Sequence, residues 1–229
     1  MSTVKVVDII DRAVVVLNDT TNVRWTKDEL LLWFNDAQRA VVNRRPDANS
    51  VNEDYTTVGQ SAAANTKQTL PASGLRLLKV VRNVGGAAIT IIRQDILDEQ
   101  VRNWHDASSP VTDVRHFIFD DRDPKSFYLY PAPTTTHEVE IVYSVAPSDV
   151  SVSNFDTDVQ TISLDDTYAN AILDYMLYRA YSKDAEYAEN AQRATAHLQI
   201  FESSLGVITQ ADMSASANGQ GMGQPPERR

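Results

Sequence analysis

Four histidines and a run of aspartates are the side chains in this sequence that could carry acid–base or metal chemistry. The histidines are His105, His116, His137 and His197. None lies three or four residues from another, so the sequence lacks the helical histidine pair that binds zinc. It also lacks a glycine-rich phosphate loop and a G-x-S-x-G nucleophile motif. A Ser-His-Asp triad stays open, because its members need not be close in the chain.

Asp120, Asp121 and Asp123 form the acidic run, in "FDDRDPKSFYLYPAP". A calcium loop needs a glycine at its sixth position and a later glutamate, and Pro124 stands where such a loop would continue. We therefore interpret the run as a β-hairpin turn initiated by the Asp-Pro step, with a metal site as the alternative. No catalytic, metal-binding or cofactor-binding residue is predicted, and no cofactor is expected.

Composition limits what the chain can be. It has 229 residues, 42% of them apolar, which is enough for one large domain or two small ones. The absence of cysteine excludes disulfides, thiol nucleophiles and cysteine-ligated zinc. No apolar run of about eighteen residues occurs, so no membrane span is expected, and the acids in "MSTVKVVDIIDR" argue against a signal peptide. The net charge of -10 disfavours a surface that grips nucleic acid.

The first element expected to position these residues is a helix over residues 4–18. Val7, Ile10, Val14 and Leu17 share one face at helical spacing, and Thr3 is a candidate N-cap. A strand is the alternative for this valine-rich run.

A second helix is predicted within "RWTKDELLLWFNDAQRAVVNRRPDAN", residues 24–49. Thr26 and Glu29 form a capping box, Trp25 is placed to pack on Leu30, and Pro46 ends the helix. The apolar stripe consists of Leu30, Trp33, Phe34, Ala37 and Val41. The polar positions expected to be free for another molecule are Asp36, Gln38, Arg39 and Asn43, and Arg44 and Arg45 lie in the last turn, either solvated or facing a partner's carboxylates or phosphates.

A β-rich region follows. Residues 49–68 are expected to form a loop or short strands, and residues 69–146 contain four to six short antiparallel strands by spacing. Gly85-Gly86 resembles a hairpin turn, and "DILDEQVRNWHDA" predicts a short helix with Asp95 as its cap. The buried face of "VEIVYSV" is expected to carry Val139, Ile141 and Tyr143.

Residues 164–206 predict a helical hairpin with a break near Ser182-Lys183-Asp184. Ser163 or Asp165 can cap its start, Asp165 and Asp166 supply negative charge there, and Gly206 suits the end. The buried positions expected in the first helix are Ala169, Ile172, Leu173, Met176, Leu177 and Ala180. Those expected in the second are Ala188, Ala191, Ala194, Leu198, Phe201 and Leu205. Residues 207–229 should be flexible when alone.

The predicted fold class is α+β: a helical bundle formed by the N- and C-terminal helices, with an inserted small antiparallel β domain and a flexible C-terminal arm. The predicted boundaries are 1–48 for the N-terminal helices, 49–163 for the β-rich domain, 164–206 for the helical hairpin and 207–229 for the arm.

Three segments in this order, "WTKDELLLWFNDAQRAVVNRRPDA", "DPKSFYLYPAP" and "LYRAYSKDAEYAENAQRATAHLQIF", resemble phage head-to-tail adaptor proteins, especially those of short-tailed phages. The resemblance covers most of residues 3–206; beyond Gly206 the match is only in character. It implies a structural, non-enzymatic virion protein, made in the host cytoplasm, that forms a ring of about twelve subunits below the portal. Such a ring extends the DNA channel used in ejection and carries nozzle, tail and fibre proteins.

The implied partners are the portal ring, neighbouring adaptor subunits, tail nozzle and fibre proteins, and genomic DNA that passes through the lumen without sequence-specific binding. The arm would bind the portal, with candidate residues Val207, Ile208, Met213, Met222, Pro225, Arg228 and Arg229. The candidate subunit-interface residues are Asp36, Arg39, Asn43, Arg44 and Arg45.

Two alternatives stay open. One is another tail component, such as a nozzle or tail-completion protein. The other, ranked last, is a virion-associated hydrolase that uses a carboxylate pair such as Asp120 and Glu138.

Overall fold

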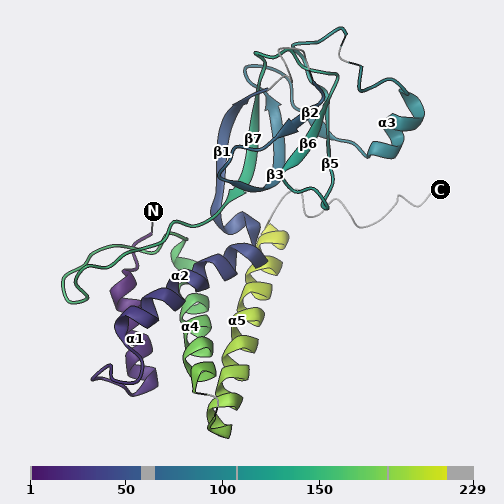
Figure 1. The fold of residues 1–229 in the computed structure, drawn as a ribbon. Helices are drawn as coiled ribbons and strands as arrows, with labels where there is room; N and C mark the ends of the chain where they lie inside the picture. Colours follow the sequence, from purple (N-terminus) through teal and green to yellow (C-terminus); the bar gives the residue numbers. More distant parts are fainter. Residues whose placement is uncertain (1, 58–64, 107, 185, 216–229) are drawn as a thin grey trace. The chain divides into compact units, whose positions relative to one another are not determined.

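The computed structural model describes residues 2–57, 65–106, 108–184 and 186–215, the last eight of these without their side chains (Figure 1). The chain divides into two compact units, one formed by residues 1–45 with 148–229 and the other by residues 46–147. We call them the helical unit and the β unit. The class is α+β, with five α-helices and two small sheets in the described part of the chain.

The helical unit contains α1 (Val6–Leu17), α2 (Lys27–Arg44), α4 (Ala169–Lys183) and α5 (Ala188–Ala215), and the 3-10 turn η3 (Asp166–Tyr168) precedes α4. Helix α4 packs against the other three. All four predicted core residues of α1 are buried, as are Leu30, Phe34, Ala37 and Val41 of α2. The predicted apolar faces of these two helices are therefore largely confirmed.

The helix ends follow the sequence signals in α2 but not in α1. The capping box of Thr26 and Glu29 forms, and α2 ends at Arg44, one residue before the C-cap Arg45 and two before Pro46. In α1 the N-cap is Lys5, without a side-chain bond, so the prediction that Thr3 caps this helix is wrong. Thr3 instead bonds Asp166, which lies far away in the sequence.

Three details of the helical packing differ from the predictions. Trp33, Leu173 and Leu198 are only half-buried, and Ala188 and Ala191 are exposed; Ala191 lies on the outward face of α5 with Gln192 and Thr195. Gly206 does not end the last helix, because α5 continues to Ala215. One glycine costs a helix only about 1 kcal/mol relative to alanine, which its neighbours can offset.

The β unit has two sheets that share one apolar core. The first has the order β1-β7-β3, and the second has the order β2-β6-β5-β4. The strands are β1 (Ser50–Thr56), β2 (Lys67–Thr69), β3 (Gly74–Asn83), β4 (Thr90–Ile91), β5 (His116–Phe119), β6 (Ser126–Tyr130) and β7 (Glu138–Val145), with η1 (Pro46–Asn49) before β1 and α3 (Gln94–Gln100) after β4. Val139, Ile141 and Tyr143 face the core as predicted.

Five strands, β3 to β7, lie within residues 69–146, which agrees with the four to six predicted there, and β1 and β2 fall where a loop or short strands were expected. The chain does reverse at Gly85, which has a φ of 72°. After this turn Ala88 pairs antiparallel with Arg82 of β3, as in the predicted hairpin, and the chain then joins the second sheet, where β4 pairs with β5 in parallel. Asp95 lies in the first turn of α3, where Arg93 is the N-cap, so Asp95 is not the cap.

Residues 148–163, which the sequence analysis placed with the strands, belong to the helical unit. None of the described helices is both long enough and apolar enough to cross a membrane.

Candidate interaction surfaces

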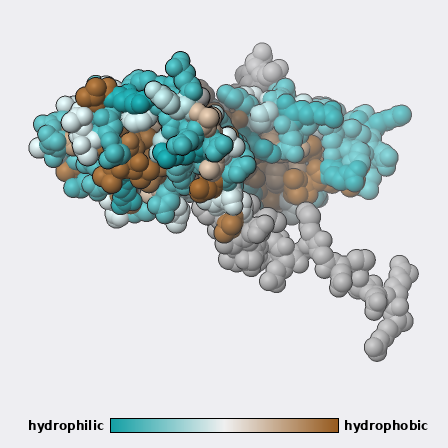
Figure 2. All heavy atoms as spheres, turned by 90° about the horizontal axis from the view of Figure 1, so that it is seen from below, coloured by the Kyte–Doolittle hydropathy of each residue, from teal (hydrophilic) through white to brown (hydrophobic). Residues whose placement is uncertain are grey.

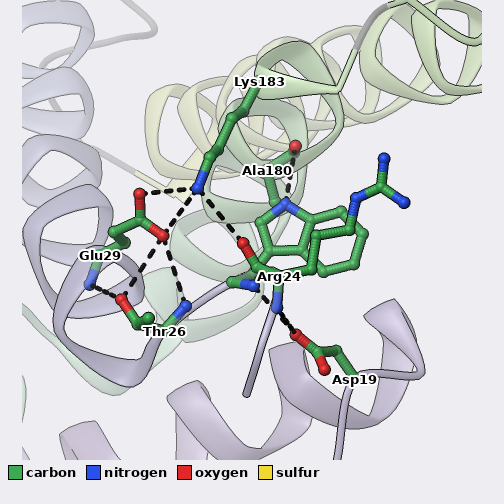
Figure 3. A network of polar contacts seen from close by, with 7 residues as sticks. Asp19, Arg24, Thr26, Glu29, Ala180 and Lys183 are labelled. Carbon is green, nitrogen blue, oxygen red and sulfur yellow. Dashed lines mark hydrogen bonds and ion pairs between the residues drawn. The ribbon is translucent and has the colours of Figure 1, made fainter. Parts of the chain in front are cut away.

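A polar network joins the α1–α2 loop to the end of α4 (Figure 3). The carboxylate of Asp19 accepts hydrogen bonds from the backbone N–H groups of Val23, Arg24 and Trp25, the last at 2.9 Å. These bonds, the one from Trp25 above all, hold the pKa of Asp19 below its usual range. Trp25 is buried, and its Nε1 donates to the carbonyl of Ala180 at 3.1 Å. The loop is thereby fixed to α4.

Lys183, at the end of α4, completes this network. Its Nζ donates to both carboxylate oxygens of Glu29, at 2.7 and 2.8 Å, and to the carbonyl of Arg24 at 3.2 Å. The bond from Lys183 lowers the pKa of Glu29. One carboxylate therefore closes the capping box of α2 and also pairs with α4. Asp19, Glu29 and Lys183 are all hydrogen-bonded within the network, which therefore holds the helices in place.

A segment of residues 148–165 crosses the helical unit and is held by polar side chains from α2. The amide of Asn35, which is 8% exposed, donates to the carbonyl of Val150 and accepts from its N–H, both at 2.9 Å. Gln38, 1% exposed, accepts from the N–H of Ser163 at 2.8 Å. The prediction that Gln38 is free for a neighbouring molecule is therefore wrong.

Asp166 anchors the N-terminal residues. Its carboxylate accepts from the Thr3 hydroxyl at 2.6 Å, from the N–H groups of Thr3 and Val4, and from the Ser2 hydroxyl at 2.9 Å. The Thr3 hydroxyl contributes most to a pKa of Asp166 that lies well below its usual range. Asp165 caps η3 by accepting from the N–H of Thr167. The predicted acidic helix start is present, but its main task is to bind the other end of the chain.

The predicted interface residues of α2 are mostly paired within the subunit. Asp36 bonds Arg39 at 3.1 Å, and Arg39 also pairs with Asp149. Arg44 pairs with Glu202 of α5 at 2.8 Å. Asn43 is exposed, whereas Arg45 is 5% exposed and lies over the ring of Tyr168, so it is a packing residue of this subunit.

Two outward faces of the helical unit carry exposed apolar or uncharged side chains. On α1, Val15 is 71% and Val16 48% exposed, and they line a shallow groove with Leu173 and with the charged residues Asp8, Asp11 and Arg12. On α5, two adjoining shallow grooves run along the face turned away from α4, lined by Ala191, Gln192, Thr195, Ala196, Gln199, Ile200, Ser203 and Ser204. Figure 2 shows hydrophobic side chains gathered among hydrophilic ones on the helical unit as seen from below.

The predicted portal-binding residues fall at the end of the chain. Val207 is 63% exposed on α5, and Ile208 and Met213 lie in α5 without described side chains. Met222, Pro225, Arg228 and Arg229 lie outside the described residues.

The acidic run between β5 and β6 forms a turn, as predicted. Asp120 accepts from the N–H of Asp123 through its carbonyl at 3.1 Å, and Asp121 pairs with Arg76 at 2.6 Å. The hollow beside Asp120 is lined by ten residues that do not include Glu138, so the two candidate hydrolase carboxylates do not share it. Within the described ranges, no group of three or more acidic or histidine side chains is placed to hold a metal ion.

The comparison with known families decides between these interpretations. The family model described as SU10 adaptor protein matches residues 4–222. The chain belongs to this family of phage adaptor proteins. The predicted resemblance to head-to-tail adaptors is thus confirmed, and a structural role in tail assembly within the virion follows from it. No curated protein matches the chain.

Sequence reasoning missed three residues that hold this adaptor together: Asn35, Gln38 and Asp166. Asn35 and Gln38 are polar residues on the buried side of an amphipathic helix, a signal that points to buried hydrogen bonds but names no partner. Asp166 gave no signal for its contacts, because its partners lie more than 160 residues away.

Proposed function

We propose that this adaptor forms a ring of about twelve subunits below the portal, in which each subunit repeats the same contact with the next. The observation that carries the proposal is the family match over residues 4–222. The ring would extend the DNA channel and present an attachment platform to nozzle, tail and fibre proteins.

Within this proposal the helical unit serves as a rigid bundle. The network of Asp19, Glu29 and Lys183 supports that role, because it ties the α1–α2 loop and the start of α2 to the end of α4 through charge-assisted hydrogen bonds. The exposed polar side of α2, with Asp36, Asn43 and the charged heads of Arg39 and Arg44, stays a candidate contact surface toward another subunit.

The end of α5 and the residues that follow it form the proposed portal-binding arm. Val207 lies on α5 and is well exposed, which suits a residue that another protein covers. An arm that becomes ordered on binding loses conformational entropy, and that loss reduces its affinity. Genomic DNA would pass through the lumen without sequence-specific contacts, which suits the net charge of -10.

Native mass spectrometry tests the proposal on the full-length chain, first alone and then mixed with the purified portal of the same genome. We expect a complex in which one portal carries many adaptor copies, whatever the free state. A ring that forms without portal affinity would assign the protein to a lower position in the tail. A monomer that does not bind the portal would overturn the proposal.

A further inference from the structure

The outward side of α1 has the features of a protein-binding surface. Arg12, Val15 and Val16 share this side at helical spacing, and the two valines are 71% and 48% exposed. Leu173 of α4 extends the apolar surface at its base. The guanidinium of Arg12 has no ion-pair partner in the described part of the chain. An exposed apolar cluster with a charged rim is typical of interfaces between proteins.

The outward side of α5 is its complement. Exposed residues along the middle of this face are uncharged. Ala196 lines both adjoining grooves, and Ile200 lines one of them. The two charged residues that flank the face contact residues of the same subunit. Arg193 lies over the ring of Tyr181, and Glu202 pairs with Arg44. A hydrophilic surface helix normally carries charges on the side that faces water. Small side chains in a groove allow a second helix to approach closely.

Helix α4 contacts both α1 and α5, and consecutive residues of α4 mark the same level on the two. Leu173 lines the groove of α1, while the carboxylate of its neighbour Asp174 accepts a hydrogen bond from Nδ1 of His197 on α5, at 2.9 Å. The stretch around Val15 and the stretch around His197 are therefore level along α4. Figure 1 shows that α1 and α5 run in opposite directions within the helical unit.

A ring requires two such unlike faces on every subunit, because each copy must offer one face to the copy before it and the other to the copy after it. Rotation about an axis along these helices keeps their level and direction. In a ring built this way, the α1 of one copy would meet the α5 of the next antiparallel. Val15 and Val16 fall beside Ala196 and Ile200.

The same antiparallel register places a charge opposite its counter-charge. Three residues before Val15 on α1 is Arg12, and three residues after Gln199 on α5 is Glu202. The side chain of Glu202 is 51% exposed although it pairs with Arg44, so a second arginine can reach it. The charge of Arg12 is thus opposite to that of Glu202. Asp8 and Asp11 line the same groove and have the same sign as Glu202, and Asp11 is already paired with Lys27.

We propose that the contact between neighbouring copies of this chain is formed by the α1 face (Arg12, Val15, Val16 and Leu173) of one copy packed antiparallel in the α5 groove (Ala196, Gln199 and Ile200, with Glu202 beside it) of the next. This inference rests on the proposed ring. It names the second copy as the molecule that covers both faces.

Cysteine cross-linking tests the contact directly, because the natural chain contains no cysteine. The variant Val15→Cys with Ala196→Cys is assembled on the portal and oxidised. We expect a ladder of covalent multimers on a denaturing gel. The matched control, Val23→Cys with Ala196→Cys, uses another exposed valine, 81% accessible, in the loop after α1, and should give no ladder.

Mixing single-cysteine chains tests the polarity of the contact. Val15→Cys chains alone should stay uncross-linked, and a mixture with Ala196→Cys chains should give dimers only. Portal-bound rings of the double variant that fail to cross-link would overturn this surface and leave the proposed function standing. If the unmodified chain forms no portal-bound ring, the proposed function fails as well. Cross-links in the control at the same yield would also overturn the surface.

Discussion

Asn35 should be one of the most sensitive polar positions of the helical unit. Its side chain makes two hydrogen bonds to the backbone of Val150, both 2.9 Å long and both buried. Asn35→Ala removes both partners at once and leaves a buried N–H and a buried carbonyl unpaired. Each unpaired buried group costs about 1–3 kcal/mol, and the better helix propensity of alanine returns about 0.5 kcal/mol. We expect the free energy of unfolding to fall by about 1.5–5.5 kcal/mol.

Urea unfolding followed by far-UV circular dichroism at the helix band measures this loss. The matched control is Asn43→Ala, which makes the same chemical change two turns later on the exposed side of α2. It should leave stability unchanged or raise it by a few tenths of a kcal/mol. Hydrogen exchange adds a local readout, since the N–H of Val150 should lose protection only in the Asn35 variant. A difference below about 1 kcal/mol between the two variants would refute the argument.

Three further predictions concern the core, the chain end and pH. Phe34→Ala should cost about 3–5 kcal/mol in urea melts because its side chain is fully buried, whereas the half-buried Trp33 should cost less than about 3 kcal/mol when changed to alanine. Deleting residues 207–229 should leave the circular dichroism of a folded protein that no longer joins the portal in native mass spectra. Burial lowers the pKa of His137, so the unfolded chain binds a proton before the folded one as the pH falls. The free energy of unfolding should therefore decline as the pH falls below about 6.5. His137→Gln keeps a hydrogen-bond donor for Asn83 and should reduce that decline.

Each of these has a clear contrary result. Equal losses for the Phe34 and Trp33 variants would mean that the two side chains are equally buried. Normal portal assembly by the shortened chain would rule out the arm. An unchanged slope of stability between pH 6.5 and 5 in the His137 variant would assign that slope to other groups.

Local chemistry could be predicted where neighbouring residues decide the structure. The capping box of Thr26 and Glu29 needs only four consecutive residues, and the ring of Pro46 limits the helix before it. The alternation in β7 likewise predicted which three side chains face the core, since a strand turns successive side chains to opposite faces.

The predictions failed where distant parts of the chain decide. Residues 148–163 carry few apolar side chains and read as a loop of the β region, yet Asn35 and Gln38 bind this segment to α2. Gly206 is a good helix terminator by its own propensity, and the residues around it override that preference. Periodicity alone did not show which small residues of α5 face α4: Ala194 is buried, whereas Ala191 lies on the outward face.

The insertion of the β unit into the helical unit also bears on the order in which the chain folds. The residues that complete the helical unit are separated by roughly 100 others, and bringing them together as an open coil costs chain entropy that grows with loop length. Once β1 and β7 pair, however, Ser50 lies opposite Ser144, so the two ends of the insertion are neighbours. The effective loop shrinks to a handful of residues, which lowers the closure cost by about 2 kcal/mol. During synthesis, α1 and α2 are made first but cannot pack until α4 has been made. The β unit is made in between, so it can fold before α4 is complete and bring the two ends of the insertion together.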